Sequence, residues 1–161
     1  MSLSIQISTL DAARDGDLSV YDGVITIENS NIEHPLRVDY NPPKQLVLRF
    51  DDICGPIDDF IEPQESHVQR ALTFADEIGD GSLLIHCHAG ISRSSAIGLA
   101  IIAKQLGKGK ELESVEMLEK INPYACPNKS LVLMTDDILD RNMILYKATS
   151  DKMSLTDKRI F

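Results

Sequence analysis

The sequence predicts an α/β fold with a mainly parallel central sheet flanked by helices. Short apolar runs typical of strands alternate with longer segments in which apolar residues recur at helical spacing. The run from Ser82 to His86 is short and apolar, as expected for a buried parallel strand, and it leads through a loop into an apolar helix. Strand–helix–strand order of this kind indicates helices packed on the faces of a mainly parallel sheet.

Turn and helix signals delimit the elements in order. A strand follows the turn signal Asp22-Gly23, and a β-rich run further on ends in Asp51-Asp52. Gly79 and Gly81 end the first long helical pattern, and Asn122-Pro123 and Cys126-Pro127 break the later ones. The expected elements are strands at 3–8, 24–27 and 46–50, a helix at 67–78, a strand at 82–86, and helices at 94–106, 112–121 and 130–145.

Length and composition predict one domain that spans residues 1–161. A chain of 161 residues can bury most of its apolar surface in a single core. No stretch approaches the roughly 20 apolar residues of a membrane span, so we expect a soluble protein. The opening Met-Ser-Leu-Ser lacks the basic head and the long apolar core of a secretory signal, and the expected compartment is therefore the cytoplasm.

The net charge indicates which classes of partner are disfavoured, and the number of cysteines indicates whether they form disulfides. Asp and Glu number 25 against 16 Lys and Arg, which gives a formal net charge of −9. This balance disfavours a nucleic acid or an anionic membrane as partner, because both attract basic patches. The three cysteines, Cys54, Cys87 and Cys126, cannot all pair with one another and are too few for a secreted disulfide scaffold, so we expect reduced thiols.

The loop between the strand at 82–86 and the following helix is the most informative segment, Cys87-His88-Ala89-Gly90-Ile91-Ser92-Arg93. The start of a helix at the carboxyl end of a parallel strand offers unpaired backbone N–H groups and a partial positive charge to an anion. The residues between Cys87 and Arg93 suffice to wrap a tetrahedral phosphate, and Gly90 is free to let the amides point inward. The planar guanidinium of Arg93 can grip two phosphate oxygens. The predicted phosphate-binding residues are His88, Ala89, Gly90, Ile91, Ser92 and Arg93.

The same positive field favours the thiolate form of Cys87, because a helix N-terminus beside an arginine can lower the pKa of a cysteine thiol. A thiolate below the phosphorus can attack in line and form a cysteinyl-phosphate that water later hydrolyses. Arg93 and the loop amides would hold the equatorial oxygens during this attack. Ser94 could donate a hydrogen bond that makes the sulfur a better leaving group in the second step.

His86 is expected to be a buried orienting residue rather than a proton carrier. Adjacent residues of a strand point to opposite faces, so His86 faces away from a pocket into which Cys87 points. For the same reason His86, Cys87 and His88 do not form a plausible set of metal ligands, and no second cluster at zinc spacing is present.

The segment from His86 to Ser94 resembles the His-Cys-x-x-Gly-x-x-Arg-Ser/Thr signature of protein tyrosine and dual-specificity phosphatases. The similarity extends less sharply over 46–106, and the small size resembles the compact dual-specificity-like branch, bacterial members included. The resemblance implies a protein tyrosine phosphatase-like fold and hydrolysis of phosphate monoesters, with Cys87 as nucleophile and Arg93 as phosphate clamp. We expect no metal or organic cofactor.

The leaving group of a phosphate ester needs a proton, and a carboxylic acid on a movable loop can supply it. The resemblance implies an aspartate upstream of the cysteine. Asp52 lies 35 residues before Cys87, and Asp51 lies one residue further away. Asp58 and Asp59 lie 29 and 28 residues before the cysteine. Asp52 is favoured because it begins the loop after the apolar run, and the other three remain alternatives.

Three further polar residues have two interpretations each. Cys54 and Cys126 are most simply inert thiols, but either could protect Cys87 from over-oxidation by forming a disulfide. Asn128 follows a proline near the start of a helix, which is typical of an N-cap. The resemblance also implies an amide side chain over the phosphate pocket.

Two other functions compete with hydrolysis. A rhodanese-like sulfur transferase also cradles an anion in a cysteine loop, but it needs neither an upstream acid nor an Arg-Ser ending. A catalytically inactive phosphoprotein-binding module would not need Cys87, Arg93 and a candidate acid together. The expected substrate is a phosphoprotein, with phosphotyrosine favoured and dual specificity open, and the loops around 15–31 and 52–65 are expected to set the depth of the pocket. The signature loop has no lysine to meet the extra phosphates of an inositol lipid.

Overall fold

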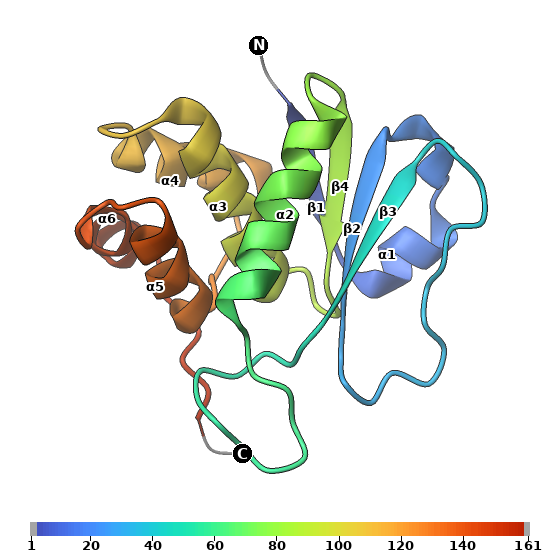
Figure 1. Ribbon diagram of the computed structural model, residues 1–161, viewed down its shortest axis with the longest axis horizontal. Helices are drawn as coiled ribbons and strands as arrows, with labels where there is room; N and C mark the ends of the chain where they lie inside the picture. Colours follow the sequence, from blue (N-terminus) through green and yellow to red (C-terminus); the bar gives the residue numbers. More distant parts are fainter. Residues whose placement is uncertain (1–2, 160–161) are drawn as a thin grey trace.

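The described part of the chain contains one four-stranded sheet that is parallel throughout (Figure 1). The computed structural model describes residues 3–159, so Met1 and Ser2 of the opening segment lie outside the described residues. The strands, in the spatial order β1-β4-β2-β3, are β1 (Ser4–Ser8), β4 (Ser82–His86), β2 (Gly23–Glu28) and β3 (Lys44–Arg49). The predicted α/β architecture is confirmed.

Six α-helices and one 3₁₀ turn cover the sheet within residues 3–159. They are α1 (Leu10–Asp15), η1 (Leu18–Val20), α2 (Glu65–Ile78), α3 (Arg93–Leu106), α4 (Glu111–Ile121), α5 (Lys129–Ile138) and α6 (Ile144–Lys152). Helices α2 to α6 lie on one face and α1 lies on the other (Figure 1). In this part of the chain no helix is both long enough and apolar enough to cross a membrane.

Burial of the two central strands on both faces explains their composition. Every residue of β2 is buried, and all of β4 except its first residue is buried. Alternate side chains enter two separate cores. Leu83 and Ile85 join the large core under α2 to α6, whereas Val24 and Leu84 join a smaller core with Ala13 of α1. Two-sided burial is why these strands read as continuous apolar runs in the sequence.

The last helix predicted from the sequence is in fact two helices, α5 and α6. The chain between them has positive φ at Asp140, Asn142 and Met143, a backbone conformation that interrupts a right-handed helix. The buried carboxylate of Asp136 accepts the N–H groups of Met143 and Tyr146 at 2.6 and 2.8 Å, and so caps the start of α6. Apolar spacing continues through the break, which is why the sequence predicted a single helix.

Candidate active site

The signature loop, residues 87–93, joins the end of β4 to the start of α3. Cys87 is buried, and its Sγ lies 3.1 Å from the hydroxyl oxygen of Ser94 in the first turn of α3. The backbone N–H of Gly90 donates to the same sulfur at 3.3 Å. Because a thiolate can only accept, the Ser94 hydroxyl and the Gly90 N–H would both stabilise a negative charge on this sulfur at the helix N-terminus.

Gly90 is required by the geometry of this loop. Its φ is +69°, and a Cβ at this position would lie 2.8 Å from the backbone carbonyl of Ser8 at the end of β1. The loop is also tied from outside. The amide of Asn122 donates to the Gly90 carbonyl at 2.8 Å, and the N–H of Leu10 donates to the carbonyl of His88 at 3.0 Å. The curvature of the loop is therefore fixed by neighbours on three sides.

Arg93 is buried and only partly satisfied. Its Nη1 donates to the carbonyl oxygen of Phe50 at 2.8 Å, which fixes the guanidinium next to the end of β3. Its Nε is buried and has no hydrogen-bond partner within residues 3–159. A buried, charged donor without a partner is costly, so this Nε is available to an acceptor such as an anion.

Asp52 links the loop after β3 to the signature loop. Its Oδ1 accepts the hydroxyl of Ser92 at 2.6 Å and the amide Nδ2 of Asn128 at 2.9 Å. Both of these donors converge on Oδ1 of the carboxylate. The oxygen of the Asn128 amide accepts the N–H of Leu131, so this residue is the N-cap of α5 and also lies against Asp52. The N-cap interpretation of Asn128 is confirmed, and the same side chain also contacts Asp52.

Asp51, the neighbour of Asp52, is engaged in holding the loop. Its two carboxylate oxygens accept the N–H groups of Ser30 at 3.0 Å and Ile61 at 2.8 Å, and its own N–H donates to the Ile61 carbonyl at 2.7 Å. Burial by itself raises the pKa of Asp51, but the hydrogen bonds from Ser30 and Ile61 and the nearby charge of Arg93 outweigh burial and lower it. Asp51 is thus a clasp that closes the loop from 52 to 60.

The two later candidates lie away from this clasp. Asp58 and Asp59 are exposed at a turn near the middle of the loop. Of the four candidate aspartates, Asp52 is the one whose carboxylate contacts the signature loop within the described residues.

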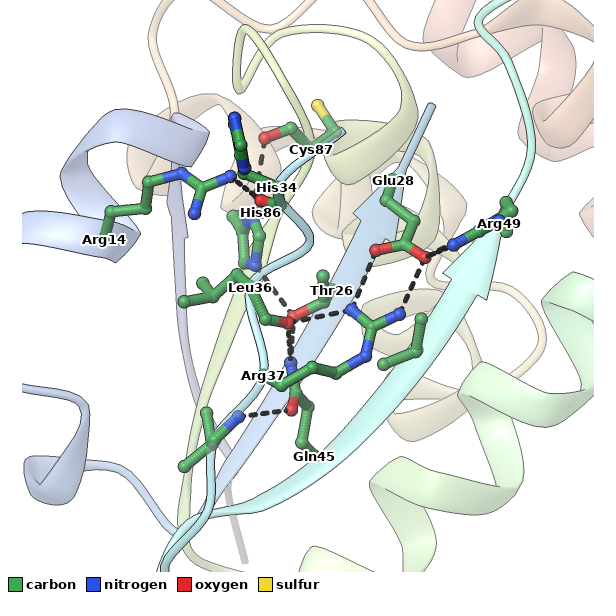
Figure 2. A network of polar contacts seen from close by, with 12 residues as sticks. Arg14, Thr26, Glu28, His34, Leu36, Arg37, Gln45, Arg49, His86 and Cys87 are labelled. Atoms are coloured by element: carbon green, nitrogen blue, oxygen red, sulfur yellow. Dashed lines mark hydrogen bonds and ion pairs between the residues drawn. The ribbon is translucent and has the colours of Figure 1, made fainter. Parts of the chain in front are cut away.

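His86 lies on the opposite side of the chain from the Cys87 sulfur, and Figure 2 shows its ring directed toward Thr26. Gln45 determines the proton positions in this network. Its Oε1 must accept the N–H of Val38 at 2.8 Å, so its Nε2 donates to the carbonyl of Leu36 at 3.0 Å and to the hydroxyl oxygen of Thr26 at 2.8 Å. The Thr26 oxygen keeps its own proton and a second lone pair for the contact with His86.

The carbonyl oxygen of Cys87 selects the tautomer of His86, because it can only accept a hydrogen bond from Nδ1. The ring proton therefore sits on Nδ1, which faces this carbonyl oxygen at 3.4 Å, and Nε2 accepts the hydroxyl of Thr26 at 2.8 Å. Burial lowers the pKa of His86 to about 4. A neutral, buried imidazole that supports the Cys87 backbone matches the expected orienting role.

The cysteines form no disulfide among residues 3–159. All three cysteines are free. Cys54 donates to the carbonyl of Thr156 at 3.3 Å, and burial raises the pKa of its thiol. Among residues 3–159, no three His, Cys, Asp or Glu side chains are grouped so that they could hold a metal ion.

Several contacts of the site were not predicted from the sequence. Phe50 contributes a backbone carbonyl, which no side-chain pattern reveals. Asn122 was interpreted only as part of a helix break, although its amide supports Gly90. Thr26 and Gln45 lie on strands whose apolar pattern dominated the interpretation.

Comparisons with known proteins agree with this geometry. No family model matches the chain. The dual specificity protein phosphatase YVH1 of Plasmodium falciparum is 34% identical over 102 residues, which cover 62% of this chain and 16% of that protein. A probable dual specificity protein phosphatase of Dictyostelium discoideum is 26% identical over 136 residues, which cover 83% of this chain and 59% of the relative. The chain therefore spans less than two thirds of the length of either relative.

Solved structures share the fold at low sequence identity. DUSP15 superposes with a TM-score of 0.62 at 18% identity, with 96% of each chain covered. The Yvh1 phosphatase domain from Chaetomium thermophilum gives a TM-score of 0.62 at 17% identity and covers 90% of this chain and 95% of that chain. The fold is similar to that of these solved phosphatase structures, and the sequence is similar to those of the two dual specificity protein phosphatases.

Proposed function

We propose that this chain is a phosphate monoester hydrolase, a protein tyrosine or dual-specificity phosphatase that acts through a cysteinyl-phosphate intermediate. The observation that carries the proposal is the buried Cys87 sulfur at the start of α3, with the N–H of Gly90 and the hydroxyl of Ser94 directed at it. Arg93 ends the same loop, and its Nε, which has no partner among the described residues, offers a charge-assisted donor to an anion.

In the first step the phosphate dianion lies in the signature loop, where backbone N–H groups and Arg93 bind its equatorial oxygens. The Cys87 thiolate attacks phosphorus in line, so that an S–P bond forms as the P–O bond to the leaving group breaks. The proton carried by the carboxyl group of Asp52 passes to the departing oxygen.

In the second step a water molecule attacks the phosphorus of the cysteinyl-phosphate. The Asp52 carboxylate takes a proton from this water, the S–P bond breaks, and inorganic phosphate is released. The hydroxyl of Ser94, 3.1 Å from the sulfur, stabilises the departing thiolate. Neutral His86 holds the Cys87 backbone and exchanges no proton.

A phosphoprotein is the proposed substrate, with phosphotyrosine favoured over phosphoserine and phosphothreonine. The exposed side chains of the signature loop are His88, Ala89 and Ile91, so the loop presents no lysine to a multiply phosphorylated lipid headgroup. The net charge of −9 supports the same choice. We propose a single phosphatase domain without metal or organic cofactor that acts in the cytoplasm, where free thiols such as Cys87 persist.

The direct test is hydrolysis of para-nitrophenyl phosphate by the wild-type protein and by Cys87→Ser, with and without a chelator. We expect chelator-resistant turnover that falls to background in Cys87→Ser. Cys126→Ser, which alters a half-buried thiol outside the signature loop, is the matched control and should keep wild-type turnover.

Two outcomes would contradict the proposal. Folded wild-type protein that binds vanadate or phosphate but shows no turnover would indicate the phosphoprotein-binding module. Transfer of sulfur from thiosulfate to cyanide without release of phosphate from esters would indicate the rhodanese-like reaction. A comparison of phosphotyrosine and phosphoserine peptides of identical sequence then tests the substrate class.

A further inference from the structure

We propose that residues 155–159, here called the C-terminal strap, position Asp52 for proton transfer, with Thr156 as the principal positioning residue. This inference rests on the proposed function, because it concerns the proposed general acid. The strap follows α6 and runs beside the loop between β3 and α2, far from it in sequence (Figure 1).

Thr156 fastens the strap to the turn before α5. Its N–H donates to the carbonyl of Pro127 at 2.9 Å, and its carbonyl accepts the N–H of Lys129 at 2.8 Å, which makes a parallel β-bridge across Asn128. Its hydroxyl donates to the carbonyl of Cys126 at 2.8 Å. Three hydrogen bonds from one residue thus fix the backbone on both sides of Asn128.

The strap also holds the loop that carries Asp52. The carbonyl of Lys158 accepts the N–H of Cys54 at 2.8 Å, and the carbonyl of Thr156 accepts the Cys54 thiol at 3.3 Å. Cys54 is only two residues beyond Asp52. The strap therefore bridges the acid-bearing loop and the turn that carries Asn128.

The side-chain amide of Asn128 connects the turn before α5 with the loop that carries Asp52. Its Nδ2 donates to Oδ1 of Asp52 at 2.9 Å and to the carbonyl of Ile53 at 3.1 Å, and its Oδ1 accepts the Cys54 thiol at 3.5 Å. The strap binds the backbone of the loop that carries Asp52 and the backbone on both sides of Asn128. The position of the Asp52 carboxylate therefore depends on the strap. The signature loop is joined to the same assembly, since the N–H of Cys126 donates to the carbonyl of Ile91 at 3.0 Å.

The ionic side chains of the strap contribute less than its backbone. Asp157 pairs with Lys129 at 3.5 Å and with Arg159 at 2.8 Å, and none of these three side chains is buried. Exposed ion pairs of this kind stabilise weakly. Arg159 therefore offers a control position within the strap.

Loss of the strap should impair proton donation more than thiolate attack, because small displacements of a catalytic group reduce its contribution steeply. Phenyl phosphate has a poor leaving group and depends on the acid, whereas para-nitrophenyl phosphate has a good one and depends on it less. The ratio of kcat values for the two substrates reports the position of the acid. A general loss of stability would lower both values together and leave this ratio unchanged.

The experiment compares Thr156→Pro, which removes the donated N–H and the hydroxyl, with a chain that ends after Ser154. The controls are Arg159→Ala and a chain that ends after Arg159. We expect the first pair to lower kcat on phenyl phosphate at least about tenfold more than on para-nitrophenyl phosphate, and the controls to keep the wild-type ratio. Thr156→Val, which loses only the hydroxyl, should shift the ratio in the same direction, and it decides the test if the stronger variants do not fold.

Combining Thr156→Pro with Asp52→Asn shows whether the two substitutions change the ratio of kcat values independently. In that background Thr156→Pro should produce no further change in the ratio, because the acid has already been removed. An unchanged ratio in every folded strap variant, or an equal additional shift in the Asp52→Asn background, would overturn the strap proposal. Absence of Cys87-dependent turnover in the wild-type chain would instead overturn the proposed function.

Discussion

The carboxylate Oδ1 of Asp52 lies 2.6 Å from the hydroxyl oxygen of Ser92, a residue of the signature loop. This hydrogen bond places a carboxyl group from the loop after β3 directly against the loop that surrounds the Cys87 sulfur. The proposed acid and the proposed nucleophile, which are 35 residues apart in sequence, are therefore joined through the signature loop.

Asp52→Asn should lower kcat on phenyl phosphate by about 100-fold or more and have a smaller effect on para-nitrophenyl phosphate, because an amide cannot donate the proton that a poor leaving group needs. Steady-state kinetics on both esters measure this difference. Asp58→Asn changes an exposed carboxylate of the same loop and serves as the control. If Asp58→Asn reproduced the loss and Asp52→Asn did not, the acid would be Asp58.

Asp51→Asn should reduce stability rather than leaving-group dependence. The two N–H groups of Ser30 and Ile61 bond to different oxygens of Asp51, and asparagine has only one side-chain oxygen. One N–H group is then left without its acceptor, so we expect a loss of about 1–3 kcal/mol in the free energy of unfolding. Urea denaturation measures the loss, and Asp59→Asn at an exposed position is the control.

The effect of Asp51 should also depend on pH. Its pKa is lowered in the folded protein, so its contribution is fully present above the unfolded value of about 3.9 and is lost as pH falls through the folded pKa. The difference in stability between the wild type and Asp51→Asn should therefore shrink below about pH 4. A difference that stayed constant down to pH 2 would contradict the proposed clasp.

His86 should remain neutral in the folded protein until the pH approaches its pKa of about 4. The unfolded chain takes up this proton near pH 6.5, so stability should fall by about 3 kcal/mol as pH is lowered from 6.5 to 4 and should then lose nothing more from this group. Histidine ¹⁵N shifts measured by NMR across this range report both the charge and the tautomer.

Substitution of Thr26 tests the origin of the tautomer. In Thr26→Val the hydroxyl that donates to Nε2 of His86 is absent, but the carbonyl of Cys87 still accepts from Nδ1, so we expect the Nδ1–H tautomer to persist. Thr26→Ser keeps the hydroxyl and should keep the wild-type spectrum. Loss of the pure Nδ1–H form in Thr26→Val would mean that the carbonyl of Cys87 does not suffice to hold the ring.

Ser94→Ala should slow the second chemical step. Removal of a hydrogen bond to a charged sulfur is expected to slow breakdown of the cysteinyl-phosphate by about 10- to 100-fold. Rapid-mixing kinetics with para-nitrophenyl phosphate should then show a burst of nitrophenol equal to the enzyme concentration, followed by slow turnover. Lower kcat without a burst would place the effect of Ser94 on the first step.

The sequence was sufficient to predict the parallel α/β fold because β4 and α3 bury their residues on several sides and so carry strong apolar patterns. It was also sufficient to single out the signature loop, where Cys87, Gly90 and Arg93 occur at a spacing that suits phosphate. The sequence did not reveal the break between α5 and α6, because left-handed backbone at Asn142 and Met143 leaves no apolar signature.

Local sequence could not separate the two adjacent aspartates. Asp51 and Asp52 differ in what reaches them from elsewhere in the chain. The N–H groups of Ser30 and Ile61 occupy Asp51, whereas Ser92 and Asn128 reach Asp52. The partners of Asp52 lie 40 and 76 residues away, so their contacts depend on the complete fold.

The hydrogen bonds between Asp51 and Ile61 separate residues 55–60, the tip of the loop, from its two fixed ends. Because Asp51 joins Ile61 through both backbone and side chain, residues 55–60 can be replaced without moving the fixed ends of the loop. Each doubling of the length of such a closed loop costs only about 0.6 kcal/mol. Longer or shorter tips between Cys54 and Ile61 are therefore expected to leave Asp51 and Asp52 in place.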